Sequence, residues 1–303
     1  MTPVSIAEDK PADVPAPAPN APAPNAAGPI ALVPASLRSP GTIDLSLVRR
    51  GAATVAHRTF QSGCMRVRIP RPGHAGEAPC AVLINTSGGL AEGDAIEQRV
   101  RWERGAVAAV ATQAAEKVYR AVSHGSAIAT TLHVEAEAQA EWLPQETILF
   151  DNARLRRDTR IHLDENASFL GVEAIVLGRH AMGETVRRGH LRDGMRIWRG
   201  GRLVYADALV LDGEVERSMN VAAIGGGAGA AAVILHASPR AAACLEPVRD
   251  ALAGARGHAA ASAWNGLLAV RLLAADGETL RRDITAALAV LRDGRLLPRV
   301  WRC

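Results

Sequence analysis

The chain contains a stretch rich in glycine and carboxylates, NTSGGLAEGD at residues 85–94, with the composition of a phosphate-binding loop. A P-loop, however, ends in Lys and Ser or Thr, which contact the phosphates and Mg²⁺. Here Asp94 follows the last glycine, and its carboxylate would repel a phosphate. The next residues, AIEQRVRW, alternate between apolar and polar as a strand does, so no helix is expected to follow. The stretch is therefore either a glycine corner between two strands or a corner that places Asp94 at a polar site.

A second glycine motif, AIGGGAGAAAVIL, matches the GxGxxA pattern of dinucleotide-binding folds at Gly225, Gly227 and Ala230. Such a site needs a strand before the motif, a full helix after it and an acid about 20 residues later. The residues that follow lead instead into a strand-like AVIL and then Pro239. We therefore expect a flexible loop between two strands.

Three acids stand out by their surroundings. Glu173 lies in the apolar segment SFLGVEAIVLG, where an ionised carboxylate must be paired with an arginine, protonated, or directed into an internal polar space. Glu146 and Asp151, in WLPQETILFD, have the residue types of a glycosidase pair, whose carboxyl groups lie roughly 5–9.5 Å apart. Aromatic residues, which stack on sugars, make up only 3% of the chain and disfavour that chemistry. A carbohydrate-active enzyme nevertheless stays open as the alternative function.

Other catalytic and metal-binding motifs are missing from the sequence. The nine histidines are scattered, with no HxH or HExxH, and no GxSxG nucleophile elbow occurs. The four cysteines, Cys64, Cys80, Cys244 and Cys303, form no CxxC pair, which favours a reducing compartment over a disulfide framework. The residues alone thus predict no dedicated metal cage, no tightly bound cofactor and no recognisable catalytic apparatus.

Composition and charge narrow the class of protein further. With 35 basic and 31 acidic residues spread along 303 positions and few aromatics between them, nucleic-acid binding is disfavoured. No uninterrupted apolar run approaches the about 18 residues of a membrane span. The N-terminus has no apolar h-region of a secretory signal, so a cytoplasmic location is expected.

The elements that must position these residues are mainly β-strands. Residues 1–40 are rich in Pro and Ala and are expected to form a disordered tail before a single domain at 41–303. From there to about residue 236 the apolar period is two. IEQRVRWE predicts a strand with Ile96, Val100 and Trp102 inward, and Gly200-Gly201 predicts a tight hairpin turn. LHVEAEAQAEW predicts one strand with Val134, Ala136, Ala138, Ala140 and Trp142 inward and Glu135, Glu137, Gln139 and Glu141 outward.

The last quarter of the chain changes to helical spacing. Two amphipathic helices are predicted, near 241–256 and 278–292. The second carries Leu280, Ile284, Leu288 and Leu291 on one face, and Thr279 is its candidate N-cap. Their apolar faces are expected to pack either on the β-domain or on a partner.

Five segments together resemble one known family. NTSGGLAEGD, TQAAEKVYR, WLPQETILFD, GVEAIVLGRHAMGE and PRVWRC occur in the order and at the spacing of the urease accessory protein family UreD, also called UreH. The resemblance runs from about residue 42 to the C-terminus. It implies a solenoid-like stack of strands with two helices, and a non-enzymatic scaffold.

The resemblance also implies partners and a cargo. UreD-family proteins bind apo-urease and a UreF-type protein, which recruits a UreG-type GTPase, and at least one of the helices is expected to help dock the UreF-type protein. The assembly is thought to pass Ni²⁺ to urease along an internal path, and the path acids correspond here to Asp94, Glu173 and Asp207. Such a path needs weakly held oxygen ligands, since a tight Cys/His cage would not release the ion.

Three positions depart from the family pattern. Glu116 stands in TQAAEKVYR where relatives often carry a small residue, and Cys303 ends the chain where a threonine is usual. NTSGG replaces a commoner His-Pro-Pro sequence, which removes one potential ligand near Asp94. No function is assigned to Glu116 or Cys303.

Overall fold

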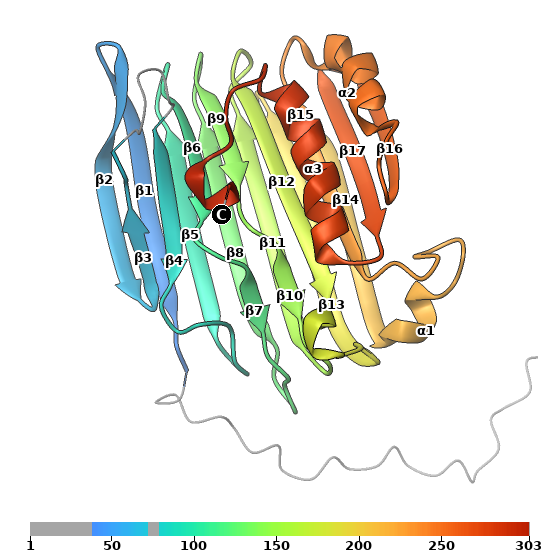
Figure 1. Ribbon diagram of the computed structural model, residues 1–303. Coiled ribbons are helices and arrows are strands. Elements are labelled where there is room, and N and C mark those ends of the chain that lie inside the picture. Colours follow the sequence, from blue (N-terminus) through green and yellow to red (C-terminus); the bar gives the residue numbers. More distant parts are fainter. Residues whose placement is uncertain (1–37, 72–78, 303) are drawn as a thin grey trace, which may run out of the picture. The chain divides into compact units, whose positions relative to one another are not determined.

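The chain winds back and forth between two β-sheets in the computed structural model, which describes residues 38–71 and 79–302 (Figure 1). The seven-stranded sheet has the order β14-β13-β11-β8-β5-β1-β2. Its strands are β1 (Gly41–Arg50), β2 (Ala53–Gly63), β5 (Ala95–Trp102), β8 (Ser126–Val134), β11 (Arg154–Leu163), β13 (Arg188–Arg199) and β14 (Arg202–Glu214).

The ten-stranded sheet has the order β16-β17-β15-β12-β9-β6-β4-β3, and β10 and β7 extend it beside β12. Its strands are β3 (Met65–Arg68), β4 (Cys80–Asn85), β6 (Val107–Thr112), β7 (Glu116–Val118), β9 (Gln139–Leu143), β10 (Thr147–Leu149), β12 (Ser168–Leu177), β15 (Ala230–Ala237), β16 (His258–Trp264) and β17 (Leu267–Ala274).

Successive strands in the middle of the chain alternate between the two sheets. As a result β5, β8, β11 and β13 run parallel in one sheet, and β4, β6, β9 and β12 run parallel in the other. Antiparallel hairpins close each end of this stack, with β1–β2 and β3–β4 at one end and β13–β14 and β15–β17–β16 at the other. This arrangement confirms the mainly β, solenoid-like fold.

The main hydrophobic core fills the space between the sheets. Every second residue of a strand points there, which is why period-two alternation predicted the strands well. Ile96, Val100 and Trp102 of β5 are buried as predicted, and Gly200 and Gly201 form the β13–β14 turn with φ of 54° and 79°.

The segment LHVEAEAQAEW differs from its prediction. It is not one strand but the end of β8 and the start of β9, joined by a turn in which Glu137 has a φ of 63°. The turn carries the chain from one sheet to the other, so the alternation is not that of a single strand. Glu141, predicted to face solvent, is 6% exposed and lies against Arg292 and Arg295.

Two helices cover the outer face of the ten-stranded sheet. They are α2 (Leu245–Leu252), which follows a 3-10 turn at Ala241–Cys244, and α3 (Gly277–Leu291) (Figure 1). The first helix is shorter than predicted, while α3 agrees within a residue at each end. The N-cap of α3 is Asp276, whose carboxylate accepts from the Thr279 amide at 2.7 Å, and not Thr279 itself.

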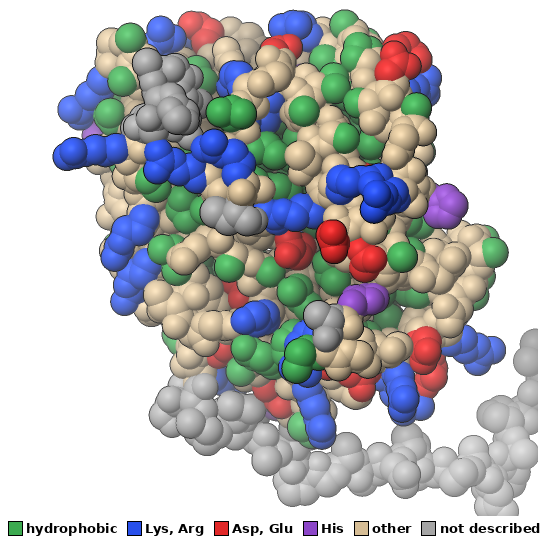
Figure 2. All heavy atoms as spheres, viewed as in Figure 1, with side chains coloured by type: hydrophobic (Ala, Val, Ile, Leu, Met, Phe, Trp, Pro, Cys, Tyr) green, Lys and Arg blue, Asp and Glu red, His purple; other side chains and the backbone are tan. Residues whose placement is uncertain are grey.

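The apolar faces of both helices form a second core with the sheet beneath them. Leu280, Ile284, Leu288 and Leu291 of α3 are buried there beside apolar residues of β12, β15 and β17. These faces therefore pack on the β-domain, and a partner would meet the polar sides of the helices. Figure 2, viewed from the side of α3, shows Lys and Arg side chains spread between apolar ones on this face.

The predicted disordered tail at 1–40 lies outside the described residues except for residues 38–40, and it stays a prediction. Cys303 also lies outside them. Among the described residues, no helix is long and apolar enough to cross a membrane.

Candidate functional site

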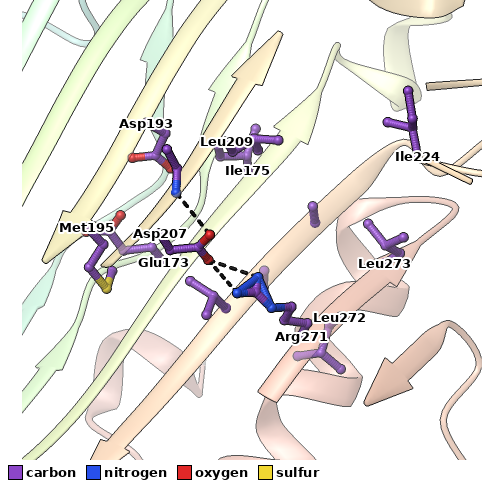
Figure 3. A pocket seen from close by; sticks show the side chains of 14 residues that line it. Glu173, Ile175, Asp193, Met195, Asp207, Leu209, Ile224, Arg271, Leu272 and Leu273 are labelled. Atoms are coloured by element: carbon purple, nitrogen blue, oxygen red, sulfur yellow. Dashed lines mark hydrogen bonds and ion pairs between the residues drawn. The ribbon is translucent and has the colours of Figure 1, made fainter. Parts of the chain in front are cut away.

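A cavity of about 300 Å³ lies between the sheets near the end closed by β14 and β17. Glu173 and Asp207, two of the three predicted path acids, both line it, together with Asp193 (Figure 3). Apolar side chains of β12, β13, β14, β15 and β17 supply most of the remaining wall. The structure thus brings together two acids that are separated by more than thirty positions in the chain.

Glu173 reaches the interior because β12 is buried on both faces. Its even-numbered neighbours Val172 and Ala174 pack under the helices, so Glu173 points into the space between the sheets. Its Oε2 lies 3.2 Å from the Arg157 guanidinium, and its Oε1 accepts from the Thr159 hydroxyl at 2.6 Å. Burial raises the pKa of Glu173 to about 7, although the positive charge of Arg157 opposes the shift. Glu173 is therefore both paired with an arginine and directed into a cavity, which are two of the environments expected from the sequence.

Arg157 holds a second carboxylate at the same place. It donates to both oxygens of Asp193, at 2.8 and 2.6 Å, and to the Thr147 hydroxyl at 3.0 Å. Burial would lower the pKa of this guanidinium, but Asp193 and Glu173 raise it above its ordinary value, so Arg157 stays charged. One cation thus faces two carboxylates, which leaves the cluster an excess of negative charge whenever Glu173 is ionised.

The sequence interpretation did not single out Arg157 or Asp193. A signal was nevertheless present, because both occupy inward positions of their strands. Arg157 shares the inward phase of β11 with Leu155 and Thr159, and Asp193 shares that of β13 with Leu191. A charged residue at an inward position requires a partner there.

Asp207 lies at the more open side of the cavity. Its Oδ2 lies 2.9 Å from the Arg271 guanidinium on the other sheet (Figure 3). The same oxygen accepts from the buried Tyr205 hydroxyl at 2.9 Å. The side chain of Arg271 is 58% exposed, against 29% for Asp207. Burial and the adjacent Asp207 raise the pKa of Tyr205, which keeps its proton on the hydroxyl for this hydrogen bond. Arg271 therefore spans the two sheets at the edge of the cavity.

Asp94, the third predicted path acid, lies at a different place in the fold. It is 3% exposed at the glycine corner before β5, and it does not line the cavity. Its carboxylate accepts from the Ser39 amide at 2.6 Å and from the Ala91 amide at 2.8 Å. The Asp94 carboxylate is thus held by one backbone amide of its own corner and by one from the segment before β1.

Glu116 lies near Asp94 and has an unusual protonation equilibrium. Burial raises its pKa to about 7, and the negative charge of Asp94 adds to this, while a hydrogen bond from the Asn85 amide at 3.0 Å opposes it. Glu116 therefore adds a buried carboxyl group close enough to Asp94 for the two charges to interact.

The glycine corner also carries Glu92, whose carboxylate is bound by backbone amides in the way that a P-loop binds a phosphate. The Glu92 carboxylate accepts from the backbone amides of Val122, Ser123 and His124, at 2.6 to 2.9 Å. Hydrogen bonds, above all from the Ser123 hydroxyl, lower the pKa of Glu92 well below its usual range. The corner therefore provides the bound carboxylate, and it does not provide the amides that would bind a phosphate.

The other motifs form no site with these residues. The second glycine motif leads into β15 and not into a helix, as predicted, but the element before it is the short helix α1 (Val215–Met219) and not the predicted strand. Glu146 pairs with Arg281 at 3.5 Å, and Asp151 accepts from the amides of Arg187 and Arg188 at 2.8 and 3.0 Å. Neither carboxylate lines the cavity, so the glycosidase hypothesis gains no support from their positions.

The chemistry that these residues allow is weak, exchangeable binding of a cation. Within residues 38–71 and 79–302, no group of three or more His, Cys, Asp or Glu side chains is placed to hold a metal ion. The cavity acids are oxygen ligands, and each already contacts an arginine. A cation there would compete with a guanidinium or with the proton on Glu173.

Fold and site together define a solenoid-like β protein with three carboxylates at an internal cavity. The family model for the UreD urease accessory protein matches residues 39–302. The chain is 47% identical to the urease accessory protein UreD of Xanthobacter autotrophicus over 264 residues, which cover 87% of this chain and 90% of that one. It is 44% identical to that of Azorhizobium caulinodans over 268 residues, 88% of this chain and 98% of the other. The chain therefore belongs to the UreD family of urease accessory proteins, and its role lies in urease maturation.

Proposed function

We propose that this protein is a non-enzymatic scaffold of the cytoplasm that binds apo-urease and a UreF-type protein, through which a UreG-type GTPase joins the complex. In this proposal Ni²⁺ is the cargo and passes through the interior on its way to urease. The observation that supports it is the cavity between the sheets, where Glu173, Asp193 and Asp207 converge in a chain of the UreD family.

The charge arrangement suits transit better than storage. Ni²⁺ binds oxygen ligands less tightly than a set of thiolates and imidazoles, so carboxylates release it more readily. Arg157 and Arg271 offset most of the negative charge of the acids while no metal ion is present, which limits uncompensated charge in a buried space. In this proposal, Asp94 and Glu116 form a second acidic site on the path of the ion, at the glycine corner.

Omission from a co-expression system tests the scaffold role. Urease subunits and the other accessory proteins are produced with and without this chain, and urease activity and the nickel content of purified urease are measured. A tagged copy of the chain is used in parallel to capture its partners. The proposal expects loss of activation without the chain, and capture of both urease and the UreF-type protein with it.

Full activation without the chain, together with no captured urease, would refute the scaffold proposal. The carbohydrate-active alternative would then be examined by measuring the distance between the carboxyl groups of Glu146 and Asp151 against roughly 5–9.5 Å.

A further inference from the structure

The outer face of the seven-stranded sheet carries a cluster of arginines that the proposed transfer path does not use. On β11 and β13 the inward positions are mostly apolar, while the outward positions are mostly charged. Arg154 and Arg156 of β11 and Arg192 of β13 lie on this outward side, and we call these three the arginine cluster. Arg156 and Arg192 are exposed and Arg154 is half-buried.

Strand register places two of these cations directly opposite each other. Arg156 and Arg192 are neighbours across the parallel pair, a position in which like charges are destabilising. The neighbouring pair, Arg160 and Arg196, shares Asp158, at 2.9 and 3.1 Å. Within the described residues, no ion pair or hydrogen bond is found for the guanidinium groups of the arginine cluster. The cluster therefore costs the fold stability without a compensating contact.

A row of stacked rings lies on the same face. His133, His162 and Trp198 are neighbours across β8, β11 and β13, with ring centroids 4.9 and 4.8 Å apart and nearly parallel planes. They border a hollow of about 220 Å³. Burial lowers the pKa of both histidines, with further lowering by Arg101 for His133 and by Arg160 for His162, so the rings are neutral near pH 7 and easier to desolvate. Trp and Arg are also the side chains that most often dominate the energy of protein interfaces.

We infer that this face, made of the arginine cluster and the ring row, is the docking surface for a partner protein that presents a patch of carboxylates. Planar guanidinium groups bind carboxylates through two parallel hydrogen bonds, and the ring row supplies an apolar contact six positions further along the same two strands. The helices α2 and α3 pack on the other sheet and leave this face uncovered by helices of the described residues. The inference rests on the proposed function, because the partners to be tested are those of urease maturation.

Charge complementarity favours a protein over a nucleic acid. On this face, rows of residues that run across the strands alternate between acidic and basic side chains. Glu97 and Asp158 lie in one row, between two rows of arginines. A phosphate backbone carries negative charge along its whole length and would be repelled at the acidic row. A protein surface offers carboxylates to the arginine cluster and basic or neutral groups to the acids.

Charge reversal tests the surface directly. The double variant Arg156→Glu/Arg192→Glu is compared with Arg68→Glu/Arg71→Glu, a control with the same change in charge at exposed positions at the end of β3 and just after it, on the other sheet and away from α2 and α3. Binding of the full-length chain to urease apoprotein and, separately, to the UreF-type protein is measured by biolayer interferometry at several NaCl concentrations. Circular dichroism melts check that both variants are folded.

The inference predicts that Arg156→Glu/Arg192→Glu weakens binding to one of the two probes by roughly 30-fold or more, while the control changes it by less than about threefold. It also predicts that wild-type binding weakens as NaCl rises and that the variant loses most of this dependence.

Three results would overturn the inference. If the wild type binds at least one probe and the double variant binds each probe as tightly as the wild type does, the surface is wrong and the proposed function stands. If the wild type binds neither probe, both fail. If the wild type binds an RNA or DNA duplex tightly and the double variant does not, the face is a nucleic-acid site.

Discussion

Arg157 allows two carboxylates to remain in the interior of the fold. A buried charge without a partner is costly, and Arg157 contacts both Asp193 and Glu173 while its own side chain is only 8% exposed. The hydroxyls of Thr147 and Thr159 complete the hydrogen bonds of this cluster. The cluster is therefore fixed in place, and the excess negative charge faces the cavity.

Removal of Arg157 should destabilise the protein strongly. In Arg157→Met the two carboxylates lose their buried cation, so we expect the free energy of unfolding to fall by about 3–5 kcal/mol. The control Arg160→Met removes an exposed partner of Asp158 and should cost less than about 1 kcal/mol. Urea unfolding followed by circular dichroism measures both values. Equal losses in the two variants would contradict this role of Arg157.

Glu116 should make stability depend on pH. Its pKa is raised from 4.5 to about 7, so between these values the folded state keeps a proton that the unfolded state has released. Stability therefore falls as pH rises through this window. Glu116→Gln keeps an acceptor for Asn85 but cannot ionise, so it should be more stable than the wild type at pH 8 by up to about 3 kcal/mol. Unfolding curves at pH 5 and pH 8 test this, and an unchanged pH dependence in the variant would contradict it.

At the scale of elements, helix α3 stabilises the ten-stranded sheet by covering its outer face. Leu288 is fully buried between the helix and the sheet. Leu288→Ala should lower the free energy of unfolding by about 2–5 kcal/mol, since it removes buried methyl groups and leaves a cavity. Arg282→Ala, on the exposed side of α3, should change it by about 0.5 kcal/mol or less. A loss at Leu288 as small as that at Arg282 would show that α3 contributes little to the fold.

The C-terminal segment fixes α3 further. Trp301 donates its indole N–H to the Leu143 carbonyl at 2.8 Å, and Arg281 of α3 lies over the Trp301 ring. Arg292, just after α3, contacts the buried Glu141 on β9 at 3.0 Å. The contacts of Trp301 with Leu143 and of Arg292 with Glu141 join residues that are more than 150 positions apart in the chain.

Local patterns predicted the strands and helices, but they could not predict contacts between distant elements. The strand β5, the β13–β14 hairpin and α3 follow from periods of two and 3.6 residues. The division of LHVEAEAQAEW into two strands was missed, because alternation continues across the turn at Glu137. The burial of Glu141 depends on Arg292, and the hydrogen bond to Asp94 comes from Ser39, 55 positions away. None of these partners is encoded by spacing along a single strand.

At the scale of the whole molecule, the proposed tasks occupy different parts of the described chain. The acids of the cavity lie between the sheets, the two helices pack on one sheet, and the arginine cluster lies on the outer face of the other. Complex formation and ion transfer are therefore expected to be separable by substitution. This separation allows a test in which the complex remains intact while transfer fails.

The central measurement is the nickel content and activity of urease matured with the double variant Glu173→Gln/Asp207→Asn. The matched control is Glu246→Gln/Asp250→Asn, which changes the same residue types at exposed positions of α2. The account predicts that the cavity variant still co-purifies with urease and the UreF-type protein, while nickel content and activity fall by roughly tenfold or more. Wild-type nickel content and activity with the cavity variant would contradict a path through this cavity.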